Sequence, residues 1–207
     1  MAFLSEHGTI CALVLAAGLS RRMGDFKPLL PLRGAALIEN SVGSVLSGGA
    51  ETAVVVTGHR ADEVEGVLRR AFGGRVCFAR NPDYASTDML RSVQLGAAAL
   101  PACEAFFLLP GDMPVVAKDT YDRLLAVREG GAASVIFPAL HGRRAHPPLI
   151  DARLIPEILA FGGGGGLRGL WKRYEDDIRA VPVDDAGVRL DVDTPEDYQR
   201  CRQRYEA

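Results

Sequence analysis

Short apolar segments alternate with segments of helical periodicity over most of the chain. Ile10–Ala16 is almost wholly apolar, which is typical of a strand buried on both faces of a sheet. In Leu37–Leu46 the apolar residues fall on one helical face, which predicts an amphipathic helix. These two patterns predict strands over Ile10–Ala16, Thr52–Thr57, Val76–Ala79, Ala105–Leu109 and Ala133–Phe137, and helices over Leu37–Leu46, Ala61–Phe72, Met89–Leu100 and Lys118–Val127. The order predicts an α/β fold in which helices cover both faces of a mostly parallel sheet.

The pattern is looser in the last third of the chain. Here we expect an extended segment over 141–150, a helix over Arg153–Phe161, a strand over Ile178–Val183 and a helix over Pro195–Tyr205. Gly162–Gly166 is a run of glycines with a high ordering entropy, so we expect a mobile loop there, either a lid or a plain linker. Because we find no internal repeat and no long linker, we expect residues 1–207 to form a single domain.

The composition narrows the classes of partner. The chain has 24 Lys and Arg against 26 Asp and Glu, a formal net charge of −2, so we expect no broad basic surface and no nucleic-acid partner. The four cysteines are scattered, as is typical of free thiols in a reducing compartment. The apolar run at 10–17 is too short to cross a bilayer and precedes the first basic residue, Arg21, unlike a secretory signal. We therefore expect a cytoplasmic protein with no membrane partner.

The segment LAAGLSRRMGDFKPLL at 15–30 combines the end of a predicted strand with glycines and cations. Gly18 lets the backbone turn sharply and expose its N–H groups. Arg22 and Lys27 then place fixed positive charge where a polyphosphate would lie. Five residues separate Gly18 from Gly24, so the spacing matches neither the P-loop nor the dinucleotide-binding glycine signature. The segment is a candidate phosphate-binding loop of another type.

A second candidate site is LLPGDMP at 108–114, where a predicted buried strand ends and presents Asp112. Because ligands of such folds sit at the carboxyl ends of the strands, we expect Asp112 to face the 16–27 loop. A carboxylate facing a phosphate site repels the phosphates unless a divalent cation lies between them. Mg²⁺ is typically bound by one or two carboxylates and by phosphate oxygens. Asp112 is therefore a candidate ligand of Mg²⁺, with Mn²⁺ as an alternative ion, in chemistry on a nucleoside triphosphate.

The segment DVDTPEDY at 191–198 carries further acids. In a strand, Asp191 and Asp193 would share one face, where two carboxylates repel unless a cation or hydrogen bonds compensate. Thr194 and Asp197 have the spacing of a helix-capping box. This interpretation leaves Asp191 and Asp193 unexplained, so one of them is a candidate second metal ligand.

His146 lies in RRAHPP at 143–148. A lone histidine is more often a hydrogen-bonded structural residue than a catalytic one. The two prolines fix the loop, as would suit the wall of a binding site. A structural role and a substrate contact therefore both stay open for His146.

These segments resemble the MobA-like nucleotidyltransferases, and the closest branch is the MocA-type molybdenum cofactor cytidylyltransferases. The resemblance runs in order along essentially the whole chain, through LAAGLSRRMG with Lys27, VTGHR at 56–60, NPDY at 81–84 before a helix with Arg91-Ser92-Val93, GDMP at 111–114, HPPLI at 146–150 and DVDTPEDY at 191–198. It implies a Rossmann-like three-layer α/β/α fold and the transfer of a nucleoside monophosphate from an NTP with release of pyrophosphate. CTP is favoured because Ala-Ala-Gly at 16–18 resembles the cytidylyl branch.

The resemblance also implies roles for individual residues. The nucleotide would be bound by Ala16, Ala17, Gly18, Ser20, Arg22, Lys27, Thr57, Asn81, Ser92 and His146, with Asn81 and Ser92 near the base and the ribose. Arg22, Lys27 and Asp112 would carry catalysis, the two cations by holding the triphosphate. Asp112 would bind Mg²⁺, and Asp191 matches the second ligand position better than Asp193.

The chain departs from this branch at two places expected to face the acceptor. Ala145 stands where the family has glycine, and the segment 86–90 adds Asp88 to a stretch that is glycine- and serine-rich in the family. A molybdopterin-type acceptor therefore stays open against a sugar or alcohol phosphate used with CTP or UTP. An alternative of another class is a non-catalytic nucleotide-binding protein that hands a cofactor to a molybdoenzyme or its chaperone. The retained cations and acids argue against that alternative, and the missing glycine fingerprint argues against a nicotinamide dehydrogenase.

Overall fold

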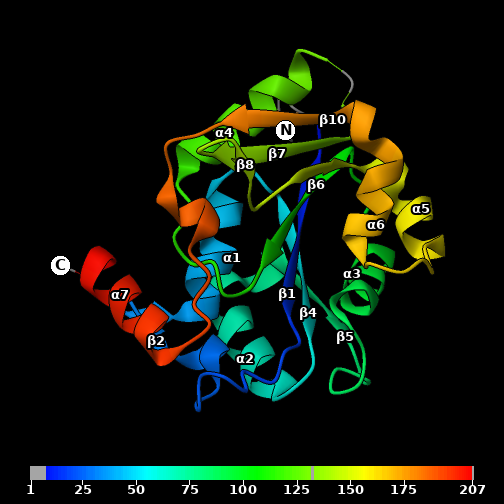
Figure 1. The fold of residues 1–207 in the computed structure, drawn as a ribbon. Coiled ribbons are helices and arrows are strands. Elements are labelled where there is room, and N and C mark those ends of the chain that lie inside the picture. Colours follow the sequence, from blue (N-terminus) through cyan, green and yellow to red (C-terminus); the bar gives the residue numbers. More distant parts are fainter. Residues whose placement is uncertain (1–7, 132, 207) are drawn as a thin grey trace.

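The computed structural model describes residues 8–131 and 133–206. Its centre is a sheet in the strand order β10-β7-β9-β6-β1-β4-β5, with β8 paired to β7 (Figure 1). The strands are β1 Ile10–Ala16, β4 Thr52–Thr57, β5 Val76–Arg80, β6 Ala105–Pro110, β7 Val135–Leu140, β8 Arg143–Arg144, β9 Leu149–Asp151 and β10 Ile178–Pro182, and a separate hairpin is formed by β2 Pro31–Leu32 and β3 Ala35–Ala36. β1 is parallel to both of its neighbours, whereas β9 runs antiparallel between β6 and β7.

Helices cover both faces of the sheet (Figure 1). They are α1 Leu37–Ser47, α2 Ala61–Phe72, α3 Met89–Ala98, α4 Lys118–Glu129, α5 Ile155–Ala160, α6 Leu167–Trp171 and α7 Pro195–Tyr205, with short 3₁₀ turns at η1 Lys27–Leu29, η2 Gly73–Arg75, η3 Ala152–Leu154, η4 Lys172–Asp177 and η5 Ala186–Arg189. Figure 1 places α1, α2 and α4 on one face and α3, α5 and α6 on the other.

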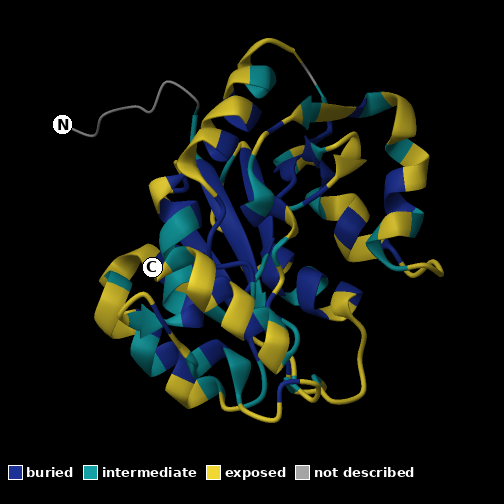
Figure 2. Ribbon diagram, turned by 60° about the vertical axis from the view of Figure 1, so that its left-hand side comes forward, coloured by how far each residue is buried: buried dark blue, intermediate teal, exposed yellow. Residues whose placement is uncertain are grey.

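The strand β1 shows why the sheet has two buried faces. Ala12 and Val14 pack with the residues of α1, while Cys11 and Leu13 pack with those of α3 on the other side. All four are fully buried. Figure 2 shows the same arrangement, with dark blue strands between helices whose outward sides are yellow. The continuous apolar run therefore reflects a central strand with a core on both sides.

The expected α/β fold with a mostly parallel sheet is confirmed, and most predicted elements differ from the observed ones only at their ends. The expected strand over Ala133–Phe137 is the largest shift, since β7 begins at Val135 and continues to Leu140. Pro138 has no backbone N–H to donate to a neighbouring strand, so its position in the sequence predicts that the strand ends before it. Its carbonyl still accepts from the Ala145 N–H at 2.8 Å, and the strand continues.

The region after β7 departs most from the expectations. The extended segment over 141–150 contains β8 and β9, and the expected helix over Arg153–Phe161 is divided into η3 and α5. The segment after Gly162–Gly166 forms α6 and η4, which the sequence did not predict. None of the helices that the structure describes is both long enough and apolar enough to cross a membrane.

Candidate active site

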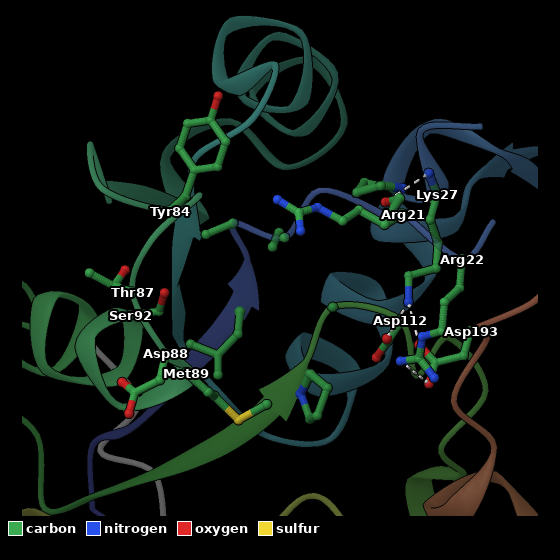
Figure 3. A pocket seen from close by; sticks show the side chains of 18 residues that line it. Arg21, Arg22, Lys27, Tyr84, Thr87, Asp88, Met89, Ser92, Asp112 and Asp193 are labelled. Carbon is green, nitrogen blue, oxygen red and sulfur yellow. Dashed lines mark hydrogen bonds and ion pairs between the residues drawn. The ribbon is translucent and has the colours of Figure 1, made fainter. Parts of the chain in front are cut away.

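A cleft of about 350 Å³ opens at the carboxyl ends of β1 and β6 (Figure 3). It is lined by Leu15, Ala16, Ala17, Gly18, Ser20, Arg21, Arg22, Lys27, Pro28, Tyr84, Thr87, Asp88, Met89, Ser92, Pro110, Gly111, Asp112 and Asp193. One side of the cleft carries Arg22, Lys27, Asp112 and Asp193, and the start of α3, with Thr87 and Asp88 just before it, forms the other side. The loop after β1 and the turn after β6 therefore meet where the sequence predicts.

The loop after β1 is closed by its own polar groups. Ser20 adopts a left-handed conformation, with φ at 53°, and its hydroxyl accepts a hydrogen bond from the Lys27 N–H at 3.2 Å. Its carbonyl accepts from the Met23 N–H at 3.0 Å. Met23 is buried and anchors the loop to the protein. These contacts return Lys27 to the edge of the sheet, with its side chain directed into the cleft (Figure 3).

Asp112 is placed by a close approach of two strand ends. The Gly111 N–H donates to the Leu15 carbonyl at 2.8 Å, which fixes the turn after β6 against the end of β1. A Cβ at Gly111 would lie 2.8 Å from that carbonyl oxygen and 2.9 Å from the Ile38 Cδ1. Only glycine allows this contact without displacement of the turn.

We expect Gly111→Ala to lower the free energy of unfolding by about 1–3 kcal/mol, the usual effect of overpacking. Chemical denaturation measures this change. Gly74→Ala is the matched control, because a Cβ at Gly74 meets no atom within 4 Å. Equal stability of the two variants would contradict the close approach.

Four charged groups of the cleft form one connected set (Figure 3). Lys27 Nζ lies 2.5 Å from Asp112 Oδ2 and 3.1 Å from Asp193 Oδ1. Arg22 Nη2 lies 2.9 Å from Asp193 Oδ2. The Lys27 side chain is only 14% exposed, whereas that of Arg22 is 71% exposed. The expectation that Asp112 faces the 16–27 loop is thus confirmed, and the Lys27 ammonium lies between two carboxylates.

Asp193 reaches the cleft through a backbone contact of its neighbour. The Val192 N–H donates to the Asp112 carbonyl at 3.0 Å, and Val192 itself is fully buried. Immediately after it, Thr194 and Asp197 form the expected capping box of α7. Residues 190–194 form no strand, so the premise that Asp191 and Asp193 share a strand face is wrong.

The structure separates the two acids of this segment. Asp193 lines the cleft and contacts both cations, whereas Asp191 is exposed and does not line the cleft. The charge of Asp191 acts instead on His146. The geometry therefore brings Asp193 to Asp112, although the family resemblance favours Asp191.

The opposite wall is organised by a buried amide. Asn81 is almost fully buried, and its side-chain nitrogen lies 3.1 Å from both Ser92 Oγ and Thr87 Oγ1. Its side-chain oxygen accepts from the Asp83 N–H at 3.0 Å. Ser92 and Thr87 line the cleft, but Asn81 does not. Asn81 therefore orients the residues that a nucleotide would meet.

Thr57 does not line the cleft, so the structure does not support its expected contact with the nucleotide. It is fully buried, and its hydroxyl donates to Glu65 Oε1 at 3.0 Å. Arg80 lies 2.8 Å from the same oxygen, and its hydrogen bond holds the pKa of Glu65 below its ordinary value. Thr57 thus helps to satisfy a buried carboxylate on α2.

His146 lines a second cavity, of about 700 Å³, beside the cleft. Burial lowers the pKa of its imidazole, although a hydrogen bond to the Leu108 backbone and the charges of Asp112 and Asp191 oppose this shift. Its Nδ1 is buried and has no hydrogen-bond partner among the described residues. His146 is therefore placed beside the site and not inside the cleft.

Several cleft residues were not singled out from the sequence. Tyr84 contacts His59, with ring centroids 5.9 Å apart, and His59 in turn contacts Phe26 at 5.3 Å. Tyr84 is the last residue of the NPDY segment, from which only Asn81 was predicted to contact the nucleotide. Met89, by contrast, belongs to the segment 86–90 that was expected to face the acceptor; it lines the cleft at the start of α3 and is 60% exposed.

The carboxylates of Asp112 and Asp193 could hold a magnesium ion together with phosphate oxygens of a nucleotide. Among the described residues, no group of three or more His, Cys, Asp or Glu side chains could hold a metal ion. Asp112 and Asp193 nevertheless converge on a shared positive charge, the Lys27 ammonium. Two carboxylates that need phosphate oxygens to complete the shell are the usual protein contribution to Mg²⁺ binding. The site therefore fits an ion that arrives with a nucleotide.

Comparisons with known proteins show the family to which the chain belongs. Residues 12–178 match the model of the MobA-like NTP transferase domain. The chain is 31% identical to the molybdenum cofactor cytidylyltransferase of Escherichia coli K12, over 95% of this chain and 97% of that protein. It is also 31% identical to the nicotine blue oxidoreductase of Paenarthrobacter nicotinovorans, over 92% and 95% of the two chains. A solved nucleotidyl transferase from Methanothermobacter superposes with a TM-score of 0.79 and 31% identity, covering 96% of this chain and 98% of that one.

Proposed function

This chain belongs to the MobA-like NTP transferases, and on that premise we propose that it transfers CMP from CTP to the phosphate of a molybdopterin-type acceptor, with release of pyrophosphate. One observation supports the proposal most directly. Two cations from early in the sequence, an acid from its middle and an acid from near its end meet in one cleft at the carboxyl edge of the sheet. Such a set suits a phosphate chain and a divalent cation together.

In the proposed reaction, an acceptor phosphate oxygen attacks the α-phosphorus of CTP. A new P–O bond forms, and the bond from the α-phosphorus to the bridging oxygen breaks. Lys27 and Arg22 stabilise the charge that develops on the leaving pyrophosphate. Because the attacking phosphate is already an anion, the chain needs no general base. Most of the rate enhancement then comes from positioning and from charge neutralisation.

Asp112 and Asp193 are the proposed ligands of Mg²⁺. When bound there, Mg²⁺ supplies further neutralisation of phosphate charge. Lys27 already compensates both carboxylates, so the cleft keeps its acids close together despite their mutual repulsion. The same lysine can then transfer its hydrogen bonds to phosphate oxygens.

A second candidate, an oxidoreductase, rests on the identity to the nicotine blue enzyme. The charged cleft argues against it, because hydride transfer does not call for this set of cations and acids. Two assays separate the candidates. Pyrophosphate release from CTP with a phosphate-bearing acceptor and Mg²⁺ supports the transferase, whereas NADH or NADPH oxidation without pyrophosphate release would support the oxidoreductase.

We expect the base preference to depend on Ala17. Ala17 lines the cleft and is almost fully buried, and we infer that its methyl group narrows the room for a purine. Ala17→Gly should raise kcat/KM for GTP relative to CTP by about 10-fold, the scale of one buried methyl group in a binding site. Pyrophosphate release with the four NTPs measures the ratio. An unchanged ratio would show that the base lies elsewhere.

A further inference from the structure

Three aromatic side chains from three different loops form a continuous row beside the cleft. The Phe26 and His59 rings meet edge to face, with centroids 5.3 Å apart, and the His59 and Tyr84 rings follow at 5.9 Å. The Tyr84 hydroxyl also lies 3.5 Å from His59 Nδ1. Ring contacts of this kind are favourable beyond the apolar surface that they bury. We call this row the aromatic bridge.

The aromatic bridge joins the two sides of the cleft. At one end, Phe26 is the residue immediately before Lys27 in the loop after β1. At the other end, Tyr84 itself lines the cleft. Figure 3 shows Lys27 and Tyr84 on opposite sides of the cleft. His59 links the two loops, so its ring is a spacer between them.

The backbone that carries His59 is fixed by close contacts. A Cβ at Gly58 would lie 2.7 Å from the Tyr84 Cβ and 2.8 Å from the Ala17 carbonyl oxygen. The His59 N–H donates to the same Ala17 carbonyl at 3.5 Å. Ala17 lines the cleft, so the turn after β4 packs directly against the cleft wall. The ring of His59 therefore extends from a backbone whose position is defined.

Arg60 secures the Phe26 end of the aromatic bridge. Its backbone is left-handed, with φ at 50°, a conformation that residues other than glycine seldom adopt. The Arg60 guanidinium donates two hydrogen bonds to Glu63, at 2.6 Å each, and its Cζ lies 4.7 Å from the centroid of the Phe26 ring. Backbone strain of this kind persists where the surroundings determine the conformation, and it is frequent at functional sites.

His59 acts on the cleft through its neighbours. It does not line the cleft itself, whereas Tyr84 and Lys27 do. The Lys27 ammonium is held separately, by Asp112 and Asp193. The aromatic bridge therefore determines the distance from this charged group to the opposite wall. A group in such a place affects a reaction by alignment and not by contact with the reacting atoms.

We infer that His59 is a positioning residue, which fixes the width of the cleft by holding Phe26 and Tyr84 at a set separation. A nucleotide would span this width, with its phosphates at Lys27 and the rest of the molecule toward Ser92. The effect on CTP rests on the proposed nucleotide transfer, whereas the aromatic bridge itself does not depend on the reaction. Because the ring separates the loops, phenylalanine should replace His59 and alanine should not.

Calorimetry of CTP binding in the presence of Mg²⁺ tests the inference. We expect His59→Ala to bind CTP about 10-fold more weakly than the wild type, at an unchanged stoichiometry, because the two sides of the cleft no longer keep their separation. A merely structural defect would lower the stoichiometry, since fewer molecules would be folded, and would leave the Kd unchanged. His59→Phe keeps a ring and should bind CTP within about 2-fold of the wild type. His59→Asn keeps a polar side chain without the ring and should resemble His59→Ala.

Phe78→Ala is the matched control. The Phe78 ring is half-buried, and the Arg69 guanidinium lies 4.7 Å from its centroid, as that of Arg60 does at Phe26. Phe78 does not line the cleft, so the loss of its ring should leave the Kd for CTP unchanged.

Limited trypsin digestion is a second measurement, which needs no nucleotide. Arg21 and Arg22 are exposed in the loop that leads to Phe26. We expect His59→Ala to be cleaved after these arginines about 5-fold faster than the wild type, because the loss of ring contacts raises the population of the open loop. His59→Phe should be cleaved at the rate of the wild type. Mass spectrometry of the fragments identifies the cleaved bond.

Two results would overturn the inference: wild-type CTP affinity and cleavage rate in His59→Ala, or a His59→Phe variant as impaired as His59→Ala. A wild type that does not bind CTP would refute the proposed function, and the cleavage rates would then decide on the aromatic bridge by themselves. Faster cleavage in His59→Ala and His59→Asn, but not in His59→Phe, would retain it. Equal rates in all three variants would refute it.

Discussion

Asp112→Asn is expected to remove the Mg²⁺-dependent activity, with turnover reduced by about 10²-fold or more. The substitution keeps the shape of the side chain but removes the charge that attracts a divalent cation. Asparagine can still accept a hydrogen bond from Lys27, so the fold and the cleft should persist. Pyrophosphate release, measured over a series of Mg²⁺ concentrations, checks the result.

The controls for this variant lie in the chain itself. Asp122→Asn removes an exposed acid on α4 that pairs with Lys118, and it should leave the activity unchanged. Asp193→Asn should raise the Mg²⁺ concentration needed for half-maximal rate more than Asp191→Asn does, because Asp193 shares a cation with Asp112. Full activity and an unchanged Mg²⁺ dependence in Asp112→Asn would remove this residue from the mechanism.

Lys27→Ala is expected to lower kcat/KM by about 10²-fold or more, the scale of losing one preorganised charged donor. Lys27 is nearly buried and lies between two acids, so its loss removes a donor for the phosphates and leaves Asp112 and Asp193 uncompensated. Single-turnover kinetics with CTP separate the effect on chemistry from the effect on nucleotide binding.

Arg22→Ala should affect the activity without lowering the free energy of unfolding, unlike Lys27→Ala. Arg22 is largely exposed, and exposed ion pairs contribute little to stability. We expect this variant to unfold at the same denaturant concentration as the wild type and still to lose activity. Lys118→Ala, at an exposed cation remote from the cleft, should change neither property. Near-normal activity in both Lys27→Ala and Arg22→Ala would contradict the phosphate-binding role of the loop.

The sequence predicted the central part of the site because topology determines it. Buried parallel strands were evident from apolar runs such as Ile10–Ala16, and the ends of adjacent parallel strands meet at one edge. That rule brings the loop that carries Lys27 close to the turn that carries Asp112. The hydrogen bond from the Gly111 N–H to the Leu15 carbonyl then sets the distance between the turn after β6 and the end of β1. This backbone contact cannot be predicted from the spacing of residues in the sequence.

Other features depend on contacts that the sequence does not encode locally. The hydrogen bond from the Val192 N–H to the Asp112 carbonyl determines that Asp193, and not Asp191, lies in the cleft. The orientation of Thr57 is made by Glu65, on the next helix. The helix α6 spans only five residues, too few for apolar periodicity to be recognised, and it follows a glycine run that is typical of a loop.

The arrangement of α7 has a consequence for biosynthesis. Tyr198 donates its hydroxyl hydrogen to the Pro31 carbonyl, so a helix from late in the sequence fastens the hairpin that follows the first loop. The ribosome must therefore synthesise the chain beyond Tyr198 before Asp193 can form its ion pair with Lys27. Until then, a nascent chain lacks one of the two acids of the cleft, and we expect it to be inert toward the nucleotide pool of the cell.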